Sequence, residues 1–263
     1  MKKNMVIFGD FHTHTPYSHG KGTVLENAIV AKQKGLKTIA ITDHGFGHKL
    51  FAVKREKFSK LKKECEKAQE KTGVKILLGL EANLTSNDGT IDLTKHELNQ
   101  LDIVLVGHHN FVKAKTVKDQ FSLFVRNIIS KIFPVSKKKI EKNTQAYLNM
   151  LEKYPQIDII THLNYGMKVN TMKVALAAKE HDVLIELNGK RICFTDQEMI
   201  NMANAGVKFI INSDAHSKNA VGEVNNAINL ITRLNIPREL VVNLDKMPTF
   251  KKDKRENNNG IVF

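Results

Sequence analysis

The sequence of 263 residues contains no tryptophan, two cysteines and five prolines. Because Cys65 and Cys193 are far apart in the chain, they exclude the disulfide framework of a small secreted domain and indicate a reducing compartment. No glycine/serine-rich or proline-rich tract marks a linker, and no segment repeats. These absences favour one folded domain over a string of small ones.

Long apolar runs are also missing. After Met5, only the apolar residues Val6, Ile7 and Phe8 precede Gly9, which is too short a stretch for the core of a signal peptide. No run approaches the roughly 20 apolar residues that cross a membrane as a helix. We therefore expect a cytoplasmic protein without a membrane span.

Aromatic residues are scarce, at 6%, whereas hydrophobic residues make up 41% and charged residues 26% of the chain. This composition is typical of globular proteins and excludes a disordered chain, a collagen-like repeat and a coiled coil. Lysine and arginine number 41 against 27 aspartates and glutamates, which gives a net charge of +14. Such a charge attracts phosphates, nucleic acids or anionic lipids. Nucleic acid is not favoured, because the sequence has no recognisable nucleic-acid-binding module.

Short apolar runs rich in isoleucine, valine and leucine alternate with helical patterns along the chain. Runs without polar alternation are typical of parallel strands that are covered on both faces. Thr23 and Glu26, and again Thr195 and Glu198, fit capping boxes at helix starts. The pattern predicts an α/β fold, a distorted (βα)7 TIM-like barrel in a single domain, with a doubly wound sheet as the alternative. The seven predicted strands are Met5–Phe11, Thr38–Thr42, Val74–Leu80, Asp102–Gly107, Ile157–Thr161, Val183–Leu187 and Val207–Asn212.

Two segments break this rhythm. Residues 113–142 hold nine basic and two acidic residues together with several large apolar ones, such as Phe121, Leu123 and Phe124. An amphipathic helix packed on the barrel is favoured there, and a lid, a subunit interface or a membrane-surface helix are the alternatives. The barrel itself is expected over residues 1–250. The polar tail over residues 251–263 is expected to fray.

Histidine and carboxylate side chains follow the predicted strands. Six of the seven strands carry His, Asp or Glu at or just past their carboxyl ends. All these ends open on one face of a parallel barrel, where active sites form. Any one of these residues, taken alone, is better explained as a packed histidine or a helix N-cap. These residues and the Asn83 beside them are His12, His14, His19, Asp43, His44, Glu81, Asn83, His108, His109, His162, Asp214 and His216.

Taken together, these side chains predict a shared metal site. Imidazoles and carboxylates without thiolates suit zinc, manganese or iron. The candidates are too many for one tetrahedral ion, so we expect a cluster of two or three divalent ions. Such clusters polarise a phosphoryl oxygen and generate hydroxide near neutral pH.

The motifs resemble those of a known family. The runs from His12 to His19, Thr42 to Gly45, Gly79 to Asn83 and Ser213 to His216 keep the motifs and the motif order of the PHP (polymerase and histidinol phosphatase) family, and look most like its small stand-alone phosphatases. The resemblance implies a trinuclear centre on a distorted (βα)7 barrel. By that pattern one ion is held by His12, His14, Glu81 and Asp214, a second by Glu81, His109 and His162, and the third by His19, His44 and His216.

The resemblance implies a fourth-strand ligand at His109, because the family pattern places a histidine at that spacing after Asp102. His108 remains a fallback ligand or a residue that lines the mouth. The stretch 113–142 departs from the family pattern and follows the fourth strand. It could therefore overhang the site and alter the choice of substrate.

From this resemblance we infer hydrolysis of a phosphomonoester by a hydroxide that bridges two ions held by Glu81, His12, His109 and Asp214. A small phosphorylated metabolite, with histidinol phosphate as a candidate, is the expected substrate. A nuclease or nucleotide phosphodiesterase of the same fold is the alternative, followed by a non-enzymatic binding module. The oligomeric state is left open. Residues expected to support the ligands or contact the substrate are Asp43, Asn83, His108, Glu186, Asn188 and Arg191, with Lys190 as a further candidate for phosphate.

Overall fold

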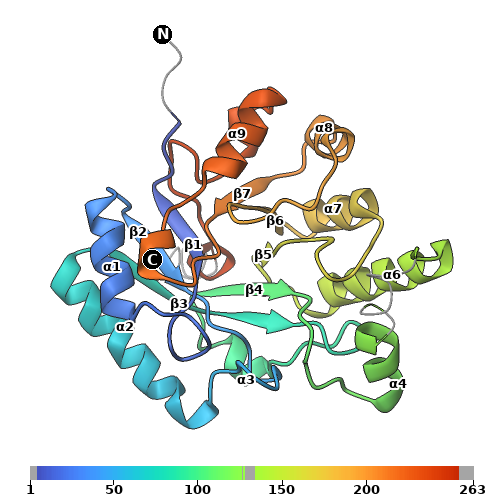
Figure 1. Ribbon diagram of the computed structural model, residues 1–263, viewed down its shortest axis with the longest axis horizontal. Helices are drawn as coiled ribbons and strands as arrows, with labels where there is room; N and C mark the ends of the chain where they lie inside the picture. The colour runs from blue at the N-terminus through green and yellow to red at the C-terminus, as the bar shows by residue number, and fades with distance from the viewer. Residues whose placement is uncertain (1–4, 126, 128–133, 255–263) are drawn as a thin grey trace, which may run out of the picture.

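The computed structural model describes residues 5–125, 127 and 134–254. Seven parallel strands pair in the order β1 to β7, and the helices surround them (Figure 1). The sheet curls into a nearly closed barrel, which confirms the predicted single-domain (βα)7 fold. The strands are β1 (Gly9–Thr13), β2 (Thr38–Ile41), β3 (Lys75–Asn83), β4 (Ile103–Gly107), β5 (Ile159–Ile160), β6 (Leu184–Asn188) and β7 (Phe209–Asn212).

The helices begin and end where the sequence indicates. Both predicted capping boxes form, at Thr23 and at Thr195, and Gly73 ends α2 in the left-handed conformation with φ of 72°. The helices are α1 (Val24–Gln33), α2 (Phe58–Thr72), α3 (Lys95–Leu98), α4 (Val117–Asp119), α6 (Lys137–Lys153), α7 (Thr171–Glu180), α8 (Asp196–Asn204) and α9 (Asn225–Arg233). Shorter turns are η1 (Arg55–Lys57), η2 (Gln120–Val125), η3 (Lys218–Ala220) and η4 (Arg238–Leu240).

The barrel closes between β1 and β7 without a continuous ladder. At the carboxyl end, His14 N donates to Ala215 O at 2.8 Å and Ala215 N donates to His12 O at 3.2 Å. Further down, the amide of Asn243 donates to Gly9 O and to Ile211 O at 3.1 and 2.6 Å, and accepts from Ile211 N at 3.0 Å. One fully buried side chain therefore joins the two edge strands.

The barrel interior is filled by apolar side chains from nearly all of the strands. Phe11, Leu105 and Ile210 belong to this inner cluster, and Phe250 closes its amino end, with the rings of Phe11 and Phe250 4.9 Å apart. A larger apolar layer lies between the strands and the surrounding helices. The candidate metal ligands gather at the opposite, carboxyl end of the strands, where active sites of parallel barrels form.

The basic stretch 113–142 does not form the single amphipathic helix favoured from its sequence. Instead α4 and the π-helical turn η2 are followed, after residues that lie outside the described part, by the start of α6. Leu123 and Phe124 are buried, whereas Phe121 is 56% exposed. The stretch therefore packs on the barrel in two pieces, and its apolar positions 128, 129, 132 and 133 lie outside the described residues.

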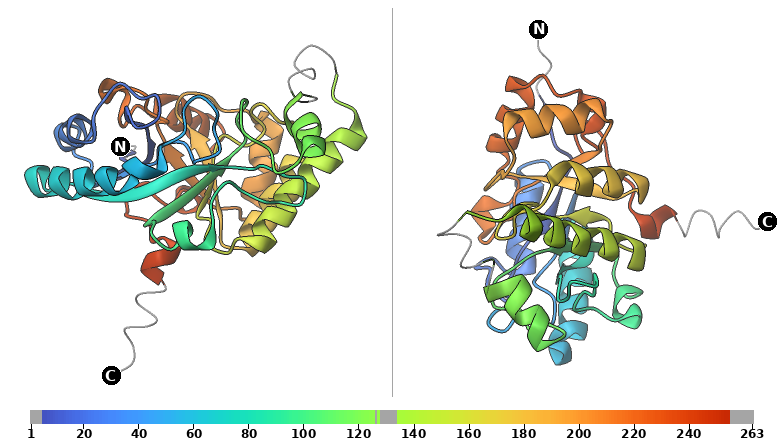
Figure 2. Two further views of the ribbon diagram at one scale, coloured as in Figure 1. Left: turned by 90° about the horizontal axis from the view of Figure 1, so that it is seen from below. Right: turned by 90° about the vertical axis from the view of Figure 1, so that its right-hand side faces the viewer.

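The start of the C-terminal tail is docked rather than frayed. Residues 251–254 form a helical turn (Figure 2), in which Lys251 Nζ donates to His181 O at 2.9 Å and Lys252 Nζ contacts Asp102 Oδ1 at 2.6 Å. The Asp102 carboxylate before β4 and the His181 carbonyl before β6 thus anchor a segment that looks only polar in the sequence. The remaining tail positions fall beyond the described residues. Among the residues that are described, no helix is long and apolar enough to cross a membrane.

We expect Asn243→Ala to destabilise the protein, because it leaves buried backbone groups of both edge strands without partners. The free energy of unfolding should fall by about 1–3 kcal/mol, measured by urea denaturation. Asn201→Ala is the matched control, since Asn201 is exposed and bonds only within α8. Equal stability of the two variants would contradict the bridging role.

Candidate metal centre

The carboxyl ends of the strands bring the predicted metal ligands into one cluster. The backbone turns sharply at two of these positions, since His162 and Asp214 have φ values of 29° and 53°. Such left-handed conformations in residues other than glycine are costly and gather at functional sites. The side chains that meet here are His12, His14, His19, His44, Glu81, His109, His162, Asp214 and His216.

Glu81, at the carboxyl end of β3, lies at the centre of this cluster and is fully buried. Its carboxylate faces five imidazoles, and each of its two oxygens has its own set of neighbours. Around Oε1 are His162 Nε2 at 2.9 Å and His109 Nε2 at 3.3 Å, and around Oε2 are His44 Nδ1 at 3.1 Å, His12 Nε2 at 3.4 Å and His14 Nε2 at 3.7 Å. This is the arrangement of a carboxylate that could bridge two ions.

A second carboxylate completes the cluster on the β7 side. Asp214 Oδ1 lies 3.5 Å from His14 Nε2, 3.8 Å from His12 Nε2 and 3.2 Å from His216 Nδ1. The ring of His19 lies 4.3 Å from that of His216 and 4.9 Å from that of His44, measured between centroids. His19 therefore approaches the cluster from the loop after β1.

Two buried polar atoms of the cluster lack hydrogen bonds, which fits a site that binds a metal ion. Glu81 Oε2 and His44 Nδ1 are buried and 3.1 Å apart, yet neither makes a hydrogen bond with any residue of the described chain. Orphaned polar atoms of this kind cost free energy unless a ligand pairs with them. Three sets of possible ligand atoms lie within 4.8 Å of one another: His14, His44 and His216; His12, His14 and Glu81; and His44, Glu81 and His109.

The protonation states of His14, His44 and Glu81 suit metal binding. Burial lowers the pKa of His14 to about 3 and holds the pKa of His44 well below its ordinary value. Burial alone would raise the pKa of Glu81, but the nearby His109 and His12 outweigh it and hold that pKa well below its usual range. Neutral imidazoles and ionised carboxylates are the forms that bind a metal ion.

Glu186 holds His12 in place. Its Oε1 lies 2.7 Å from His12 Nδ1, and the carboxylate counters the burial that would lower the pKa of His12, so this pKa lies well above its ordinary value. Asn188 and Asn212 each donate to Glu186 at 3.0 Å. Glu186 thus orients a ligand from behind, and of the two sixth-strand candidates Asn188 is the one that lines the mouth.

Asn83 and Asp43 support the ligands from two other strands. Asn83 Oδ1 accepts from His109 Nδ1 at 2.8 Å. Asp43 accepts from Thr15 N at 2.7 Å and from the hydroxyls of Thr15 and Ser18, and so fixes the loop between His14 and His19. Burial raises the pKa of Asp43 to about 6. Both side chains act through ligand positions, as polar groups around metal sites commonly do.

The fourth strand presents His109, not His108, to the cluster. The His108 ring turns away and stacks on Phe124 of η2, with centroids 5.3 Å apart and planes 14° apart. It is buried and is not among the side chains that line the mouth. The basic stretch therefore contacts the site indirectly, through the neighbour of a ligand.

The mouth of the centre is a pocket of about 170 Å³ bounded by the ligands and by Tyr165, Lys190 and Arg191. Lys190 Nζ lies 3.3 Å from His216 Nδ1, and the Arg191 guanidinium lies 4.4 Å above the Tyr165 ring. The cations therefore lie where an anion that entered the pocket would meet them.

Sequence reasoning missed three residues that support this centre. His48, which is not among the candidates from the sequence, stacks 5.1 Å from His44, and burial lowers its pKa to about 4. Thr161 donates its hydroxyl to Glu81 Oε1 at 2.8 Å. Asp92 accepts from Asn83 Nδ2 at 2.6 Å. Thr161 directly precedes a ligand and could have been found, whereas His48 and Asp92 lie in loops that carry no periodic signal.

Comparison with known proteins agrees with this geometry. A family model for the PHP domain matches residues 10–191. A probable phosphatase from Caldanaerobacter subterraneus is 33% identical, over 99% of this chain and 96% of that protein. A probable phosphatase from Shewanella frigidimarina is 31% identical, over 91% of this chain and 90% of that protein.

The fold is also similar to that of histidinol phosphate phosphatase from Lactococcus lactis, whose crystal structure holds zinc, L-histidinol and phosphate. The TM-score is 0.59 at 17% identity, covering 87% of this chain and 94% of that one. At this low identity the similarity concerns the fold alone. The match to the family model and the identity to its relatives over nearly the whole length together show that this chain belongs to the PHP domain family.

Proposed function

We propose that the protein is a metal-dependent phosphatase that hydrolyses phosphomonoesters of small molecules. The observation that carries this proposal is the buried Glu81 carboxylate, which faces five imidazoles and has one oxygen without a hydrogen bond from the described residues. The relatives named as probable phosphatases support the same activity.

In this proposal the ions are held as the family pattern implies. His12, His14, Glu81 and Asp214 would hold the first, Glu81, His109 and His162 the second, and His19, His44 and His216 the third. Zinc, manganese or iron all suit this donor set. Divalent ions at this place would polarise a phosphoryl oxygen and lower the pKa of a water molecule, so that hydroxide is available near neutral pH.

The chain's own residues position the substrate. Lys190 and Arg191 border the pocket and are placed to contact phosphate oxygens, and the contact of Arg191 with the Tyr165 ring orients its guanidinium. Glu186 and Asn83 keep the His12 and His109 rings oriented, so that the ligands need not reorganise when the substrate binds. No serine or cysteine nucleophile is required.

The shape of the mouth favours a small substrate. The inner pocket of about 170 Å³ shares Lys190, Asp214 and His216 with a neighbouring hollow of about 410 Å³, which has room for the rest of a metabolite. Histidinol phosphate is one candidate, because a protein of similar fold is named for that substrate.

A substrate panel tests the proposal directly. The metal-reconstituted protein would be assayed with p-nitrophenyl phosphate, bis-p-nitrophenyl phosphate and histidinol phosphate, each with and without a chelator. We expect turnover of monoesters that the chelator abolishes. Turnover of the diester alone would replace the phosphatase with a phosphodiesterase, and no turnover by fully metallated protein would favour a binding module.

Glu81→Ala removes the central carboxylate. We expect loss of bound metal and a fall in monoester turnover of at least roughly 10³-fold, because the ions lose a shared ligand and the imidazoles lose their counter-charge. Metal content by mass spectrometry of the folded variant, judged by circular dichroism, separates this effect from unfolding. Glu70→Ala, on the exposed face of α2, is the charge-matched control. An active, fully metallated Glu81→Ala protein would refute the bridge.

The two adjacent histidines of the fourth strand should behave differently. His109→Ala removes a side chain that lies 3.3 Å from Glu81, so kcat and metal content should both fall. His108→Ala removes a ring that packs on Phe124 and does not line the mouth, so its effect should be a smaller change, chiefly in stability. Equal kinetic losses in the two variants would undo the assignment of His109 as the ligand.

A further inference from the structure

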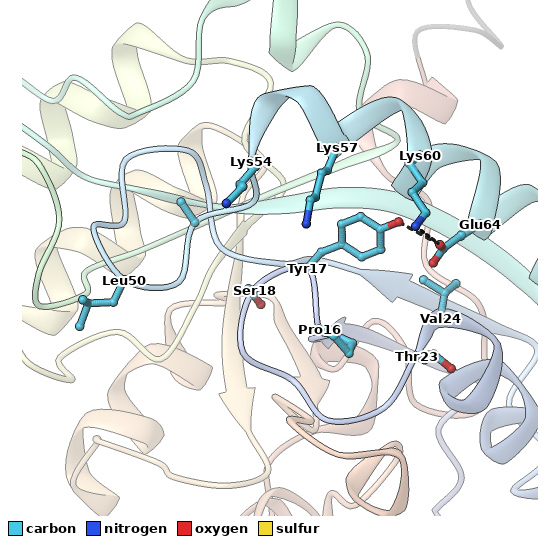
Figure 3. A pocket seen from close by; sticks show the side chains of 11 residues that line it. Pro16, Tyr17, Ser18, Thr23, Val24, Leu50, Lys54, Lys57, Lys60 and Glu64 are labelled. Carbon is cyan, nitrogen blue, oxygen red and sulfur yellow. Dashed lines mark hydrogen bonds and ion pairs between the residues drawn. The ribbon is translucent and has the colours of Figure 1, made fainter.

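A second pocket opens at the carboxyl end of the barrel, beside the metal centre. Its volume is about 390 Å³, and its walls come from the loop after β1, the start of α1, the loop after β2 and the first turns of α2. Figure 3 shows Lys54, Lys57 and Lys60 on one side and the Tyr17 ring opposite them. We call it the lysine pocket. None of the predicted metal ligands lines it.

One short segment separates the lysine pocket from the metal centre. Pro16, Tyr17 and Ser18 line the pocket, while the next residue, His19, faces the cluster. The His19 ring in turn stacks on Phe51, with centroids 4.5 Å apart. The two cavities therefore share a wall that carries a predicted metal ligand, although they are lined by different side chains.

The charge of the lysine pocket is unbalanced. Its single carboxylate, Glu64, already accepts from the Tyr17 hydroxyl at 2.9 Å and pairs with Lys60 at 3.8 Å. Lys54 and Lys57 form no ion pair or hydrogen bond with any other side chain of the described residues. Lys54 is the extended N-cap of η1 and Lys57 its last residue; Glu56 lies between them in the sequence but is exposed and does not line the pocket, and no acidic residue lies in the first turn of α2. An anion between the lysines would balance their charge.

The rim of the lysine pocket is apolar. Leu50, which lines the pocket, is 63% exposed, the adjacent Phe51 is 37% exposed, and the exposed Pro16 lines the pocket as well. Large apolar side chains exposed next to a cavity lower the free energy when a ligand covers them. The ligand therefore has an apolar body as well as an anionic group.

We propose that the lysine pocket is a binding site for an organic phosphate, separate from the metal centre. The phosphate group lies between Lys54 and Lys57, and the organic part lies against Tyr17 and Leu50. The phosphate belongs either to a separate metabolite or to a second anionic end of the substrate, and the chemistry of recognition is the same in both cases.

Phenylphosphonate is a suitable probe, because it carries an aromatic body and an anionic group that a phosphatase cannot remove. Isothermal titration of the metallated protein should reveal two sites, one at the metal centre and one in the lysine pocket. In the double variant Lys54→Ala/Lys57→Ala we expect one site to weaken about tenfold or more, because charge-assisted contacts to the anion are lost. In Glu81→Ala the other site should be lost and the lysine-pocket site kept.

Lys63→Ala/Lys67→Ala is the matched control, since it removes the same charge from exposed positions of α2, the helix that follows Lys57. The lysine-pocket proposal holds if only Lys54→Ala/Lys57→Ala weakens binding. It is overturned if both double variants weaken binding equally, which would indicate a general charge effect, or if the wild-type protein binds a single equivalent that Glu81→Ala abolishes. Because binding is measured without turnover, this result is independent of whether the protein proves to be a phosphatase.

Kinetics then identifies the source of the phosphate. If the pocket holds a second anionic end of the substrate, Lys54→Ala/Lys57→Ala raises KM for a bisphosphorylated substrate and leaves KM for p-nitrophenyl phosphate unchanged. If it holds a separate metabolite, both KM values stay unchanged while one phenylphosphonate site is still lost. A variant that keeps both sites contradicts either form of the proposal.

Discussion

The constraint on which this structure depends is the burial of a carboxylate among imidazoles. Glu81 is fully enclosed, and a lone carboxylate in that position would be protonated or would destabilise the fold. The nearby His109 and His12 keep the pKa of Glu81 low, and hydrogen bonds from Thr161 and His162 satisfy one of its oxygens. Its other oxygen accepts no hydrogen bond from the described residues, and this is where a cation completes the site. The fold thus accepts an electrostatic cost that metal binding offsets.

The contacts that stabilise the barrel lie at a distance from Glu81. Asn243 joins the edge strands, and Phe250 closes the amino end of an interior filled by apolar side chains. Because these contacts lie below the site, the carboxyl face is free to gather polar residues that pack poorly with one another. The closure between β1 and β7 also has a functional consequence. His12 and His14 face Asp214 only because the first and last strands meet through Ala215.

The sequence was sufficient to predict the barrel and the cluster of ligand candidates, because both depend on patterns among residues that are close together in the sequence. A buried strand is an apolar run, and most of the predicted ligands lie within one or two residues of a predicted strand end, whereas His19 and His216 lie in the loops that follow. The supporting contacts were harder to predict, since Asp92 reaches Asn83 across a loop and His48 reaches His44 through a turn. The basic stretch was predicted as one helix, but a π-helical turn and a second helix divide it. The spacing of apolar residues in this stretch does not indicate where the helix ends against the barrel.

The segment from His14 to His19 connects the two cavities of the carboxyl face. Asp43 fixes it from below through Thr15 and Ser18, so the segment cannot shift without breaking buried hydrogen bonds to a carboxylate. An organic phosphate against Tyr17 would therefore press on a stiff wall rather than a loose loop. The His19 ring stacks on Phe51, which follows Leu50 of the lysine pocket. A ligand in that pocket would therefore contact the same stiff segment that carries this predicted metal ligand.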